Sequence, residues 1–319
     1  MKQLDVTALG ELLIDFTQNG LSNQGNYLME ANPGGAPCNV LAMLAKLGKK
    51  TAFIGKVGDD FLGRHLKSVV EEVGIDTRNL LLDEKVHTTL AFVHTYPGGD
   101  RDFSFYRDPG ADMNLRIEEV NGELIADSKI FHFGSLSMTH PGIREATKKA
   151  LRIAKEQGCI LSYDPNLRPP LWNTLEEARE QIAFGMTQCD ILKISDNEIQ
   201  WFTGLADYDA GIRYLQNTYR IPLILLSMGP AGSRAYYRDL RVEEPPFLQK
   251  NTIETTGAGD TFCACVLNYV LEHDLQNLTE AQLHEMLRFA NAAASMITTR
   301  KGALKVMPSA DEVEKLLHG

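Results

Sequence analysis

The chain has 319 residues, of which 44% are hydrophobic and 23% charged, and its formal net charge is −10. These values are typical of a globular protein with a sizeable core, and the absence of a lysine- or arginine-rich run argues against nucleic acid or an anionic membrane as the main partner. The first residues lack the layout of a secretory signal, and no apolar run approaches the ~20 residues of a membrane helix. The five cysteines form no CxxC pair, so we expect buried thiols in a reducing cytoplasm.

Two segments of the N-terminal half carry the pattern of β-hairpins. In residues 12–32, turn residues such as Asn19-Gly20 separate apolar stretches, and in residues 88–107 two period-two segments flank Pro97-Gly98-Gly99-Asp100. A small hairpin cannot bury both of its faces alone. We therefore expect segments of about 12–32 and 88–112 to form a lid over the crevice at the strand ends of a larger sheet. A surface hairpin without function is the alternative.

A glycine cluster follows the first hairpin, in the stretch NPGGAPCNVLAMLAKLG. Gly34 and Gly35 precede a helix with an apolar face, and Asn39 falls in its first turn, where its amide could point at a ligand near the helix start. Glycine-rich helix starts are common, so a simple turn with a buried asparagine is the alternative interpretation.

Strand-like and helical stretches then alternate along the chain. This alternation predicts a single doubly wound α/β domain over residues 1–319, with a mainly parallel sheet and helices on both faces. The predicted strands are Thr51–Val57, Lys129–Phe133, Cys159–Asp164, Asp190–Ile194 and Leu223–Ser227, and the helical stretches include Phe61–Gly74, Ile143–Gln157 and Leu175–Thr187.

Polar residues follow several of these strands, at the edge of the sheet where α/β proteins place their sites. If the chain stays extended after the strand that ends at Asp164, then Asp164, Asn166 and Arg168 lie on one side. Arg168 could bind phosphate or carboxylate oxygens by two hydrogen bonds, or form a surface salt bridge with Asp164. Two further cations are Arg107, expected at the tip of the second hairpin, and Lys193.

Two more features lie at strand ends. Glu198 could hold a water around Mg²⁺, although an exposed glutamate at a helix start is the more common case. The loop SMGPAG, from Ser227 to Gly232, offers glycines for close backbone approach.

The stretch ETTGAGDTF places Gly257-Ala258-Gly259 at the start of a predicted helix. Unpaired N–H groups and the helix dipole favour an anion there, and glycine lets a phosphate approach the backbone. Asp260 lies in the first turn, where its carboxylate could accept a proton from a hydroxyl that attacks a phosphoryl group. A simple role for Asp260 as a helix cap is the alternative.

Together these stretches resemble a known family. The segment Gly34-Gly35-Ala36…Asn39, the run GKVGDDFLG and TTGAGDTF are similar to the signature regions of PfkB, or ribokinase-like, carbohydrate kinases, in the same order over essentially the whole chain. No GK[ST] follows the glycines, which distinguishes the stretch from a Walker A loop. FYRDPGADMNL and YDPNLRPPLW resemble the fructokinase branch, and the second also resembles 2-keto-3-deoxygluconate kinases.

The resemblance implies ATP-dependent, Mg²⁺-requiring phosphorylation of a sugar hydroxyl, with Asp260 as the base and the amides of Gly257, Ala258 and Gly259 as an anion hole. It also implies that Glu198 belongs to the magnesium network and that the lid forms a homodimer interface. The residues implied for sugar and phosphate are Asp15, Gly34, Gly35, Asn39, Arg107, Arg168 and Asp260. Those implied for the nucleotide are Lys193, Ser227, Gly229, Gly232, Gly257, Gly259 and Asn291.

The chain departs from the family pattern at three positions. Ser195 replaces the asparagine of the NxxE motif, and a hydroxyl can still hold a water. Glu254 replaces the common aspartate before TTGAGD, a position that helps relatives bind a monovalent cation, so a K⁺ site at Glu254 and Thr256 stays open. Cys265 replaces a glycine, where we expect altered packing and unchanged chemistry.

The function predicted from these features is that of a cytosolic fructokinase, which converts D-fructose and ATP to fructose 6-phosphate and ADP. A 2-keto-3-deoxygluconate kinase is the alternative within the family, since Arg107 and Arg168 could bind its substrate's carboxylate. A nucleotide-dependent oxidoreductase is disfavoured because no GxGxxG with an acid ~20 residues on follows the first strand. An inactive nucleotide- or sugar-binding regulatory protein would have no reason to keep Asp260 and both glycines.

Overall fold

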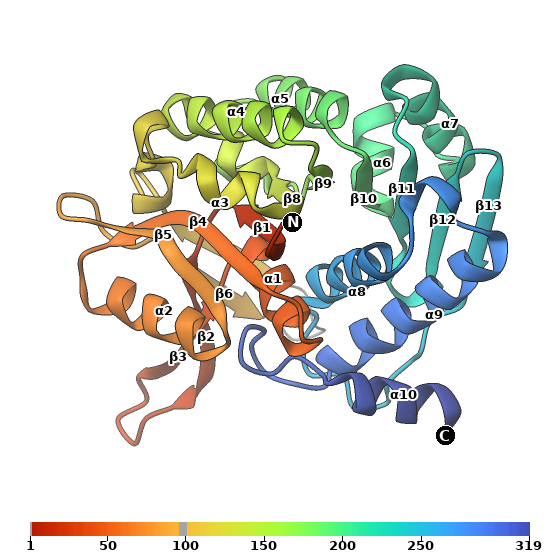
Figure 1. Ribbon diagram of the computed structural model, residues 1–319. Coiled ribbons are helices and arrows are strands. Elements are labelled where there is room, and N and C mark those ends of the chain that lie inside the picture. The colour runs from red at the N-terminus through yellow and green to blue at the C-terminus, as the bar shows by residue number, and fades with distance from the viewer. Residues whose placement is uncertain (1, 96–100) are drawn as a thin grey trace.

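A large sheet forms the centre of the computed structural model, which describes residues 2–95 and 101–319 (Figure 1). Its nine strands lie in the order β13-β12-β11-β10-β9-β8-β1-β4-β5, and they run parallel from β5 across to β11. The antiparallel strands β12 and β13 complete one edge. The bounds are β1 Leu4–Leu9, β4 Thr51–Gly58, β5 Ile75–Asp83, β8 Ser128–Gly134, β9 Ile160–Asp164, β10 Ile191–Ser195, β11 Leu223–Ser227, β12 Ser233–Tyr237 and β13 Leu240–Glu244.

Helices cover both faces of this sheet, as the alternation predicts (Figure 1). One core contains residues of α1, α8 and α9, and the other contains residues of α4, α5, α6 and α7. Because both faces are covered, β4 is buried along its whole length. The helices are α1 Ala36–Lys46, α2 Phe61–Glu72, α3 Gly122–Ala126, α4 Pro141–Glu156, α5 Leu175–Gln188, α6 Asp196–Thr203, α7 Tyr208–Tyr219, α8 Ala258–Glu272, α9 Glu280–Ile297 and α10 Ala310–His318.

A second, four-stranded sheet contains both predicted hairpins. Its order is β3-β2-β6-β7, with β2 Leu13–Leu21, β3 Tyr27–Gly34, β6 Leu90–Thr95 and β7 Arg101–Tyr106. The two hairpins join through a parallel pairing of β2 with β6. The turn predicted at Pro97-Gly98-Gly99-Asp100 lies outside the described residues. Side chains alternate between the two faces of this sheet, and we call the face that carries Asp15 and Val93 the inner face and the face that carries Phe16 and Phe92 the outer face.

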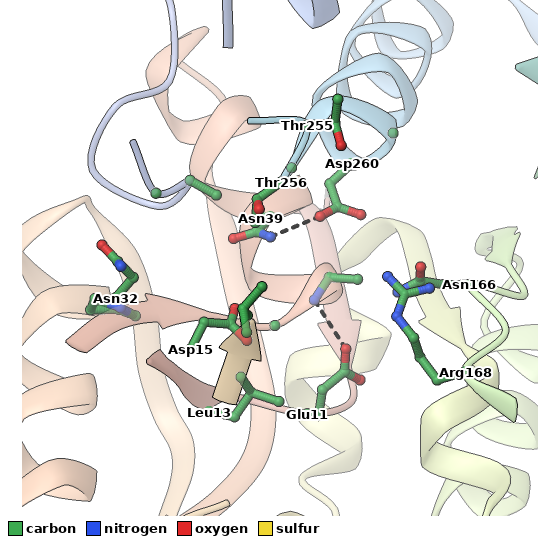
Figure 2. Close-up of a pocket in the computed structure, with 18 of the residues that line it drawn as sticks. Glu11, Leu13, Asp15, Asn32, Asn39, Asn166, Arg168, Thr255, Thr256 and Asp260 are labelled. Carbon is green, nitrogen blue, oxygen red and sulfur yellow. Dashed lines mark hydrogen bonds between the residues drawn. The ribbon is translucent and has the colours of Figure 1, made fainter. Parts of the chain in front are cut away.

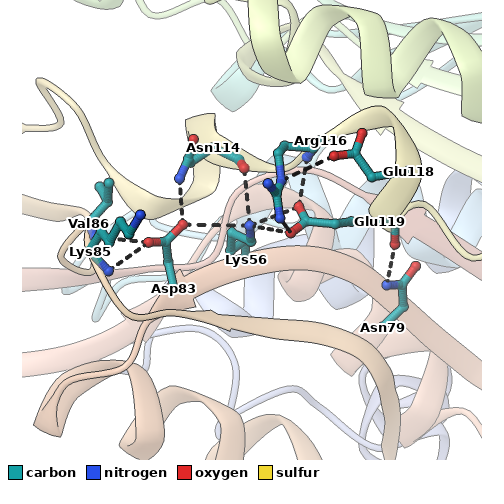
Figure 3. Close-up of polar contacts among 9 residues, drawn as sticks. All are labelled: Lys56, Asn79, Asp83, Lys85, Val86, Asn114, Arg116, Glu118 and Glu119. Atoms are coloured by element: carbon teal, nitrogen blue, oxygen red, sulfur yellow. Dashed lines mark hydrogen bonds and ion pairs between the residues drawn. The ribbon is translucent and has the colours of Figure 1, made fainter.

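After β7 the chain returns to the large sheet through two short 3₁₀ turns, Ala111–Asn114 and Ile117–Glu119. Lys56 on β4 fixes this return segment (Figure 3). Its Nζ lies 2.8 Å from Oε1 of Glu119 and 3.5 Å from Oδ2 of Asp83, and it donates to the carbonyl of Asn114. A buried ammonium group is tolerated when it is paired in this way.

Two further expectations concern the thiols and the membrane. All five cysteines are buried and free of disulfides. Across residues 2–95 and 101–319, no helix has the length and apolar character that crossing a bilayer requires.

Candidate active site

A polar pocket of about 340 Å³ lies between the inner face of the small sheet and the start of α8 (Figure 2). Segments far apart in the chain contribute to it, because the carboxyl ends of parallel strands meet at one edge of the large sheet. The polar residues that line this pocket are Glu11, Asp15, Thr17, Asn32, Asn39, Asn166, Arg168, Lys193, Glu254, Thr255, Thr256 and Asp260.

Asp260 projects into this pocket from the first turn of α8. The helix begins after Gly257, which has a φ of 76° and provides no side-chain cap. Oδ2 of Asp260 accepts a hydrogen bond of 2.7 Å from Nδ2 of Asn39 on α1 (Figure 2). Burial raises the pKa of Asp260, while Asn39, Lys193 and Arg168 oppose that rise. The carboxylate is thus held by a side chain of another helix, which differs from the simple helix-cap interpretation.

The glycines at the start of α8 allow neighbouring groups to pack closely against the backbone beside Asp260. A Cβ atom on Gly257 would lie 2.9 Å from Cβ of Ala303, and one on Gly259 would lie 3.0 Å from Nζ of Lys193. A helix start with a lysine next to it suits a phosphate or another anion. The surroundings of Gly257 and Gly259 therefore suit an anion.

Lys193 lies on β10 and forms a buried ion pair with Asp164 at the end of β9, with 3.0 Å between Nζ and Oδ2. Burial alone would lower the pKa of Lys193, but Asp164 and Glu198 raise it above its ordinary value, so the ammonium stays charged. Burial raises the pKa of Asp164 to about 6. Asp164 thus forms its ion pair with Lys193. The alternative predicted from the sequence, a salt bridge between Asp164 and Arg168, is absent among the residues that the structure describes.

The chain turns sharply after β9. Asn166 has a φ of 44°, in the left-handed region, so the expectation of an extended stretch from Asp164 to Arg168 is wrong. Asparagine tolerates this conformation better than most residues. Asn166 and Arg168 nevertheless both line the polar pocket, and Arg168 uses Nη1 to donate to the carbonyl of Leu167.

The position predicted for Arg107 is also wrong. Arg107 follows the end of β7 and does not lie at the hairpin tip. Only 7% of it is exposed, and its guanidinium forms an ion pair with Asp112, with 2.6 Å between Nη2 and Oδ2. It does not line the polar pocket, because Asp112 and the turn after β8 accept the hydrogen bonds of its guanidinium.

Close packing explains why glycine occupies positions 34 and 35. A Cβ atom on Gly34 would lie 2.4 Å from Oδ2 of Asp15, and one on Gly35 would lie 2.4 Å from the carbonyl oxygen of Glu11. Gly35 also has a φ of 126°. These two glycines let α1 begin directly against β2, which brings Asp15 and Asn39 into the same pocket.

Glu11, which was not among the predicted site residues, is 4% exposed and lines the polar pocket. Its Oε1 accepts a hydrogen bond of 3.0 Å from the N–H of Ala36, the first residue of α1 (Figure 2). Burial raises the pKa of Glu11 to about 7. The signal that could have revealed it is a lone acid at the start of the otherwise apolar run GELLI.

An apolar pocket of about 420 Å³ lies on the other side of the α8 start. The predicted nucleotide residues Ser227, Gly229, Gly232, Gly259 and Asn291 line it together. Its apolar walls come from Pro246, Phe247, Leu248, Phe262 and Ala294. Thr255 and Gly259 line both pockets, so the polar and apolar pockets meet at the helix start beside Asp260.

Hydrogen bonds hold the two acids that were predicted to bind cations, Glu198 and Glu254. Glu198 is not exposed: Oε2 accepts from the backbone N–H and the hydroxyl of Ser195, and Oε1 accepts from the N–H of Leu167. Oε1 of Glu254 accepts a bond of 2.6 Å from the N–H of Gly302. Within the part of the chain that the structure describes, no three His, Cys, Asp or Glu side chains group as a metal site.

Comparison with known proteins identifies the family. The model of the pfkB family carbohydrate kinases matches residues 3–310. The chain belongs to the PfkB family of carbohydrate kinases. It is 40% identical to probable fructokinase-2 of Arabidopsis thaliana over 307 residues, which cover 95% of this chain and 93% of that protein.

Solved structures of related kinases have the same fold. The structure of a fructokinase with bound ATP from Xylella fastidiosa matches with a TM-score of 0.89 and 32% identity, over 100% of this chain and 99% of the other. A fructokinase from Vibrio cholerae O395, in a form bound to fructose, ADP and a calcium ion, matches with a TM-score of 0.88 and 27% identity, over 99% and 100%. These matches confirm the ribokinase-like fold and an ATP-dependent phosphotransferase acting on a sugar hydroxyl.

Proposed function

We propose that this PfkB kinase is a fructokinase, which transfers the γ-phosphoryl group of ATP to the 6-hydroxyl of D-fructose. The observation that carries the proposal is the position of Asp260 in a polar pocket, which meets an apolar pocket at a glycine-rich helix start. The similarity to fructokinases over nearly the whole chain supports fructose as the acceptor.

The two pockets suit the two substrates. In the polar pocket, Asp15, Asn39, Asn166 and Arg168 offer the donors and acceptors that sugar hydroxyls need. In the apolar pocket, the walls suit an adenine ring, and the glycines allow its phosphates to approach the backbone. The acceptor hydroxyl would then lie next to Asp260.

Phosphoryl transfer requires little covalent chemistry from the protein. Asp260 accepts the proton of the attacking hydroxyl, and the N–H groups at the start of α8, with Lys193, stabilise negative charge on the transferred group. Burial favours both effects, because water is excluded and electrostatic interactions strengthen. The hydrogen bond from Asn39 fixes the direction of the Asp260 carboxylate.

Mg²⁺ would reach this site mainly through phosphate oxygens and waters, as it usually does in kinases. We propose that Glu198 holds one of these waters, since its carboxylate is kept ionised by Lys193 and by Ser195, which stands in for the family asparagine. Mg²⁺ supplies charge neutralisation between the phosphates. Glu254 and Thr256 line the polar pocket together with Gly257 and Gly259, and we propose that they bind a monovalent cation.

We propose that the small sheet forms a lid with its inner face and a dimer interface with its outer face. The inner face of the small sheet lines the polar pocket through Asp15 and Val93, so we infer that this sheet covers the sugar. On the outer face the rings of Phe16 and Phe92 stack at 4.9 Å, and Tyr106 is 66% exposed beside them. An exposed apolar sheet face suits contact with a second copy of the chain.

The five free thiols fit a reducing cytoplasm.

The test is a coupled ADP-release assay with Mg·ATP and a panel of fructose, 2-keto-3-deoxygluconate, ribose, tagatose, glucose and adenosine, each with and without K⁺. We expect the highest kcat/KM for fructose. A higher value for the keto-deoxy acid would favour the second candidate, for which Arg168 in the polar pocket is the available carboxylate partner. ATP binding without turnover of any acceptor would contradict the proposal and favour a regulatory protein.

A further inference from the structure

A buried ion pair lies where the β6–β7 hairpin joins the rest of the molecule. The side chains of Arg107 and Asp112 are 3% and 2% exposed. Both Nε and Nη2 of Arg107 bond to Oδ2 of Asp112, at 2.8 and 2.6 Å. Such a pair costs desolvation and is weak evidence for stability alone, so its geometry calls for another explanation.

The pair connects the two ends of the hairpin. Thr89 directly precedes β6, and its hydroxyl donates to Oδ1 of Asp112 at 2.5 Å. Arg107 directly follows β7. Gly110 allows this approach, since a Cβ atom there would overlap the Thr89 hydroxyl. Asp112 therefore holds both strands of the hairpin at their base.

The same pair reaches the wall of the polar pocket. Nη2 of Arg107 donates to the carbonyl of Leu136 at 3.0 Å, and Nη1 donates to Oγ1 of Thr139 at 2.9 Å, both in the turn after β8. Leu136 lines the polar pocket, as do Val93 of β6 and Phe105 of β7. The guanidinium thus joins two walls of the pocket, the hairpin and the turn after β8, through bonds in a fixed planar geometry.

We propose that Arg107 and Asp112 are positioning residues for the acceptor: they set the distance between the hairpin wall and the wall after β8, and so determine how tightly the polar pocket holds its ligand. The proposal rests on the proposed function only in taking that ligand to be a sugar. Neither Arg107 nor Asp112 lines the polar pocket or the apolar pocket. The effect of the pair reaches the pocket through Leu136 and through the two hairpin strands.

The chain offers a matched control. Lys56, Asp83 and Glu119 form a second buried ionic cluster that anchors the same return segment. None of the three lines the polar pocket or the apolar pocket. Lys56→Met leaves Asp83 without its cation, removes one of the two cations of Glu119, and should lower stability. It should leave the KM for the sugar within about twofold, the scale expected of a site away from the reaction.

The main test replaces the pair by apolar residues, Arg107→Met together with Asp112→Leu. Because no unpaired charge remains, we expect the melting temperature to stay within a few degrees of the wild type. We expect the KM for the best acceptor to rise about tenfold or more, with the KM for ATP within about twofold. Unchanged sugar KM in this folded variant, or an equal rise for both substrates, would overturn the proposal.

Thr89→Val decides the question if the double variant does not fold. It removes only the hydroxyl that joins β6 to Asp112, and we expect the sugar KM to rise about threefold to tenfold. Hydrogen exchange of the β6 and β7 amides should also accelerate relative to Lys56→Met, a readout independent of turnover. If neither changes, the proposal is wrong. Failure of the wild type to phosphorylate fructose refutes the proposed function alone, because the comparison uses whichever acceptor the wild type accepts.

Discussion

Asp260 illustrates how its neighbours tune a single carboxylate. Burial makes it more basic than an exposed aspartate, and the amide of Asn39 keeps it pointed along one direction. Lys193 and Arg168 limit the rise of its pKa, which keeps the ionised form accessible. A general base needs this combination of basicity, ionisation and orientation.

Replacing Asp260 tests the assignment at the residue scale. Asp260→Asn keeps the size of the side chain, so we expect near-normal binding of sugar and ATP in calorimetry. The turnover number should fall by about 10²–10⁴-fold, the usual contribution of a general base. A variant that kept the wild-type kcat would show that another group accepts the proton.

Asp15 should link ligand binding to stability. Burial raises its pKa to about 7, so between about pH 4 and 7 the folded chain binds more protons than the unfolded chain. The free energy of unfolding of the ligand-free protein therefore falls as the pH rises through this window. We expect Asp15→Asn to gain up to about 4 kcal/mol at pH 8 and none at pH 4, while losing sugar affinity.

Urea titrations of the wild type and Asp15→Asn at pH 4, 6 and 8 would measure this effect. Part of the slope should persist in the variant, because burial also raises the pKa of Glu11 to about 7. Identical pH slopes in the two proteins would mean that Asp15 does not titrate in this range.

At the scale of elements, the start of α8 combines an unusual backbone with limited space. Gly257 adopts a φ of 76°, and a methyl group there would meet Ala303. Gly204 at the end of α6 has nearly the same φ, 72°, with open space around it. The two glycines thus share the backbone strain of a left-handed residue and differ in what surrounds them.

Comparing Gly257→Ala with Gly204→Ala should separate strain from function. Both should lose about 1 kcal/mol of stability from backbone strain, and Gly257→Ala should lose more because its Cβ atom meets Ala303. Only Gly257→Ala should lower kcat, by about 10²-fold, because it displaces the N–H groups that we propose stabilise the phosphoryl group. Steady-state kinetics with denaturant melts would check this, and equal kinetic effects in the two variants would count against an anion hole at α8.

At the scale of the whole molecule, the small sheet has two unlike faces. Its inner face contributes carboxylate, amide and hydroxyl groups to the polar pocket, while its outer face carries Phe16, Phe92 and Tyr106. Tyr27 on β3 is also 68% exposed. Part of this apolar face packs against the core and part is exposed to water, and covering the exposed part would stabilise the sheet.

Oligomeric state should therefore depend on this sheet. We expect the wild type to sediment as a dimer at micromolar concentration, and Tyr27→Glu with Tyr106→Glu to sediment as a monomer, because buried carboxylates disfavour the contact. Phe61→Glu is the control: Phe61 is 81% exposed but lies on α2. A monomeric wild type, or dissociation by Phe61→Glu, would exclude the proposed interface.

The predicted strands and helices match the structure within two residues, since their apolar runs reflect burial on both faces of a parallel sheet. Because the strands were placed correctly, the polar residues that follow them were also predicted at the correct edge of the sheet. The wrong predictions concern the ion-pair partners of side chains. Asp164 pairs with Lys193, whereas a pair with Arg168 had been considered. Arg107 pairs with Asp112, which the sequence did not indicate. Ion pairs depend on side-chain directions, which hydrophobic periodicity does not report.

Glycines, helix starts and strand alternation are local properties of the chain, because they follow from backbone conformation and burial periodicity over a few residues. The sequence alone therefore determined the α/β architecture and the helix start that carries Asp260. Only the tertiary structure decided what surrounds that carboxylate. The partner of Asp260, Asn39, lies 221 residues away in the chain, and Glu11 joins the site only because α1 begins against it. Such contacts depend on how the strands are ordered in space, which no local pattern encodes.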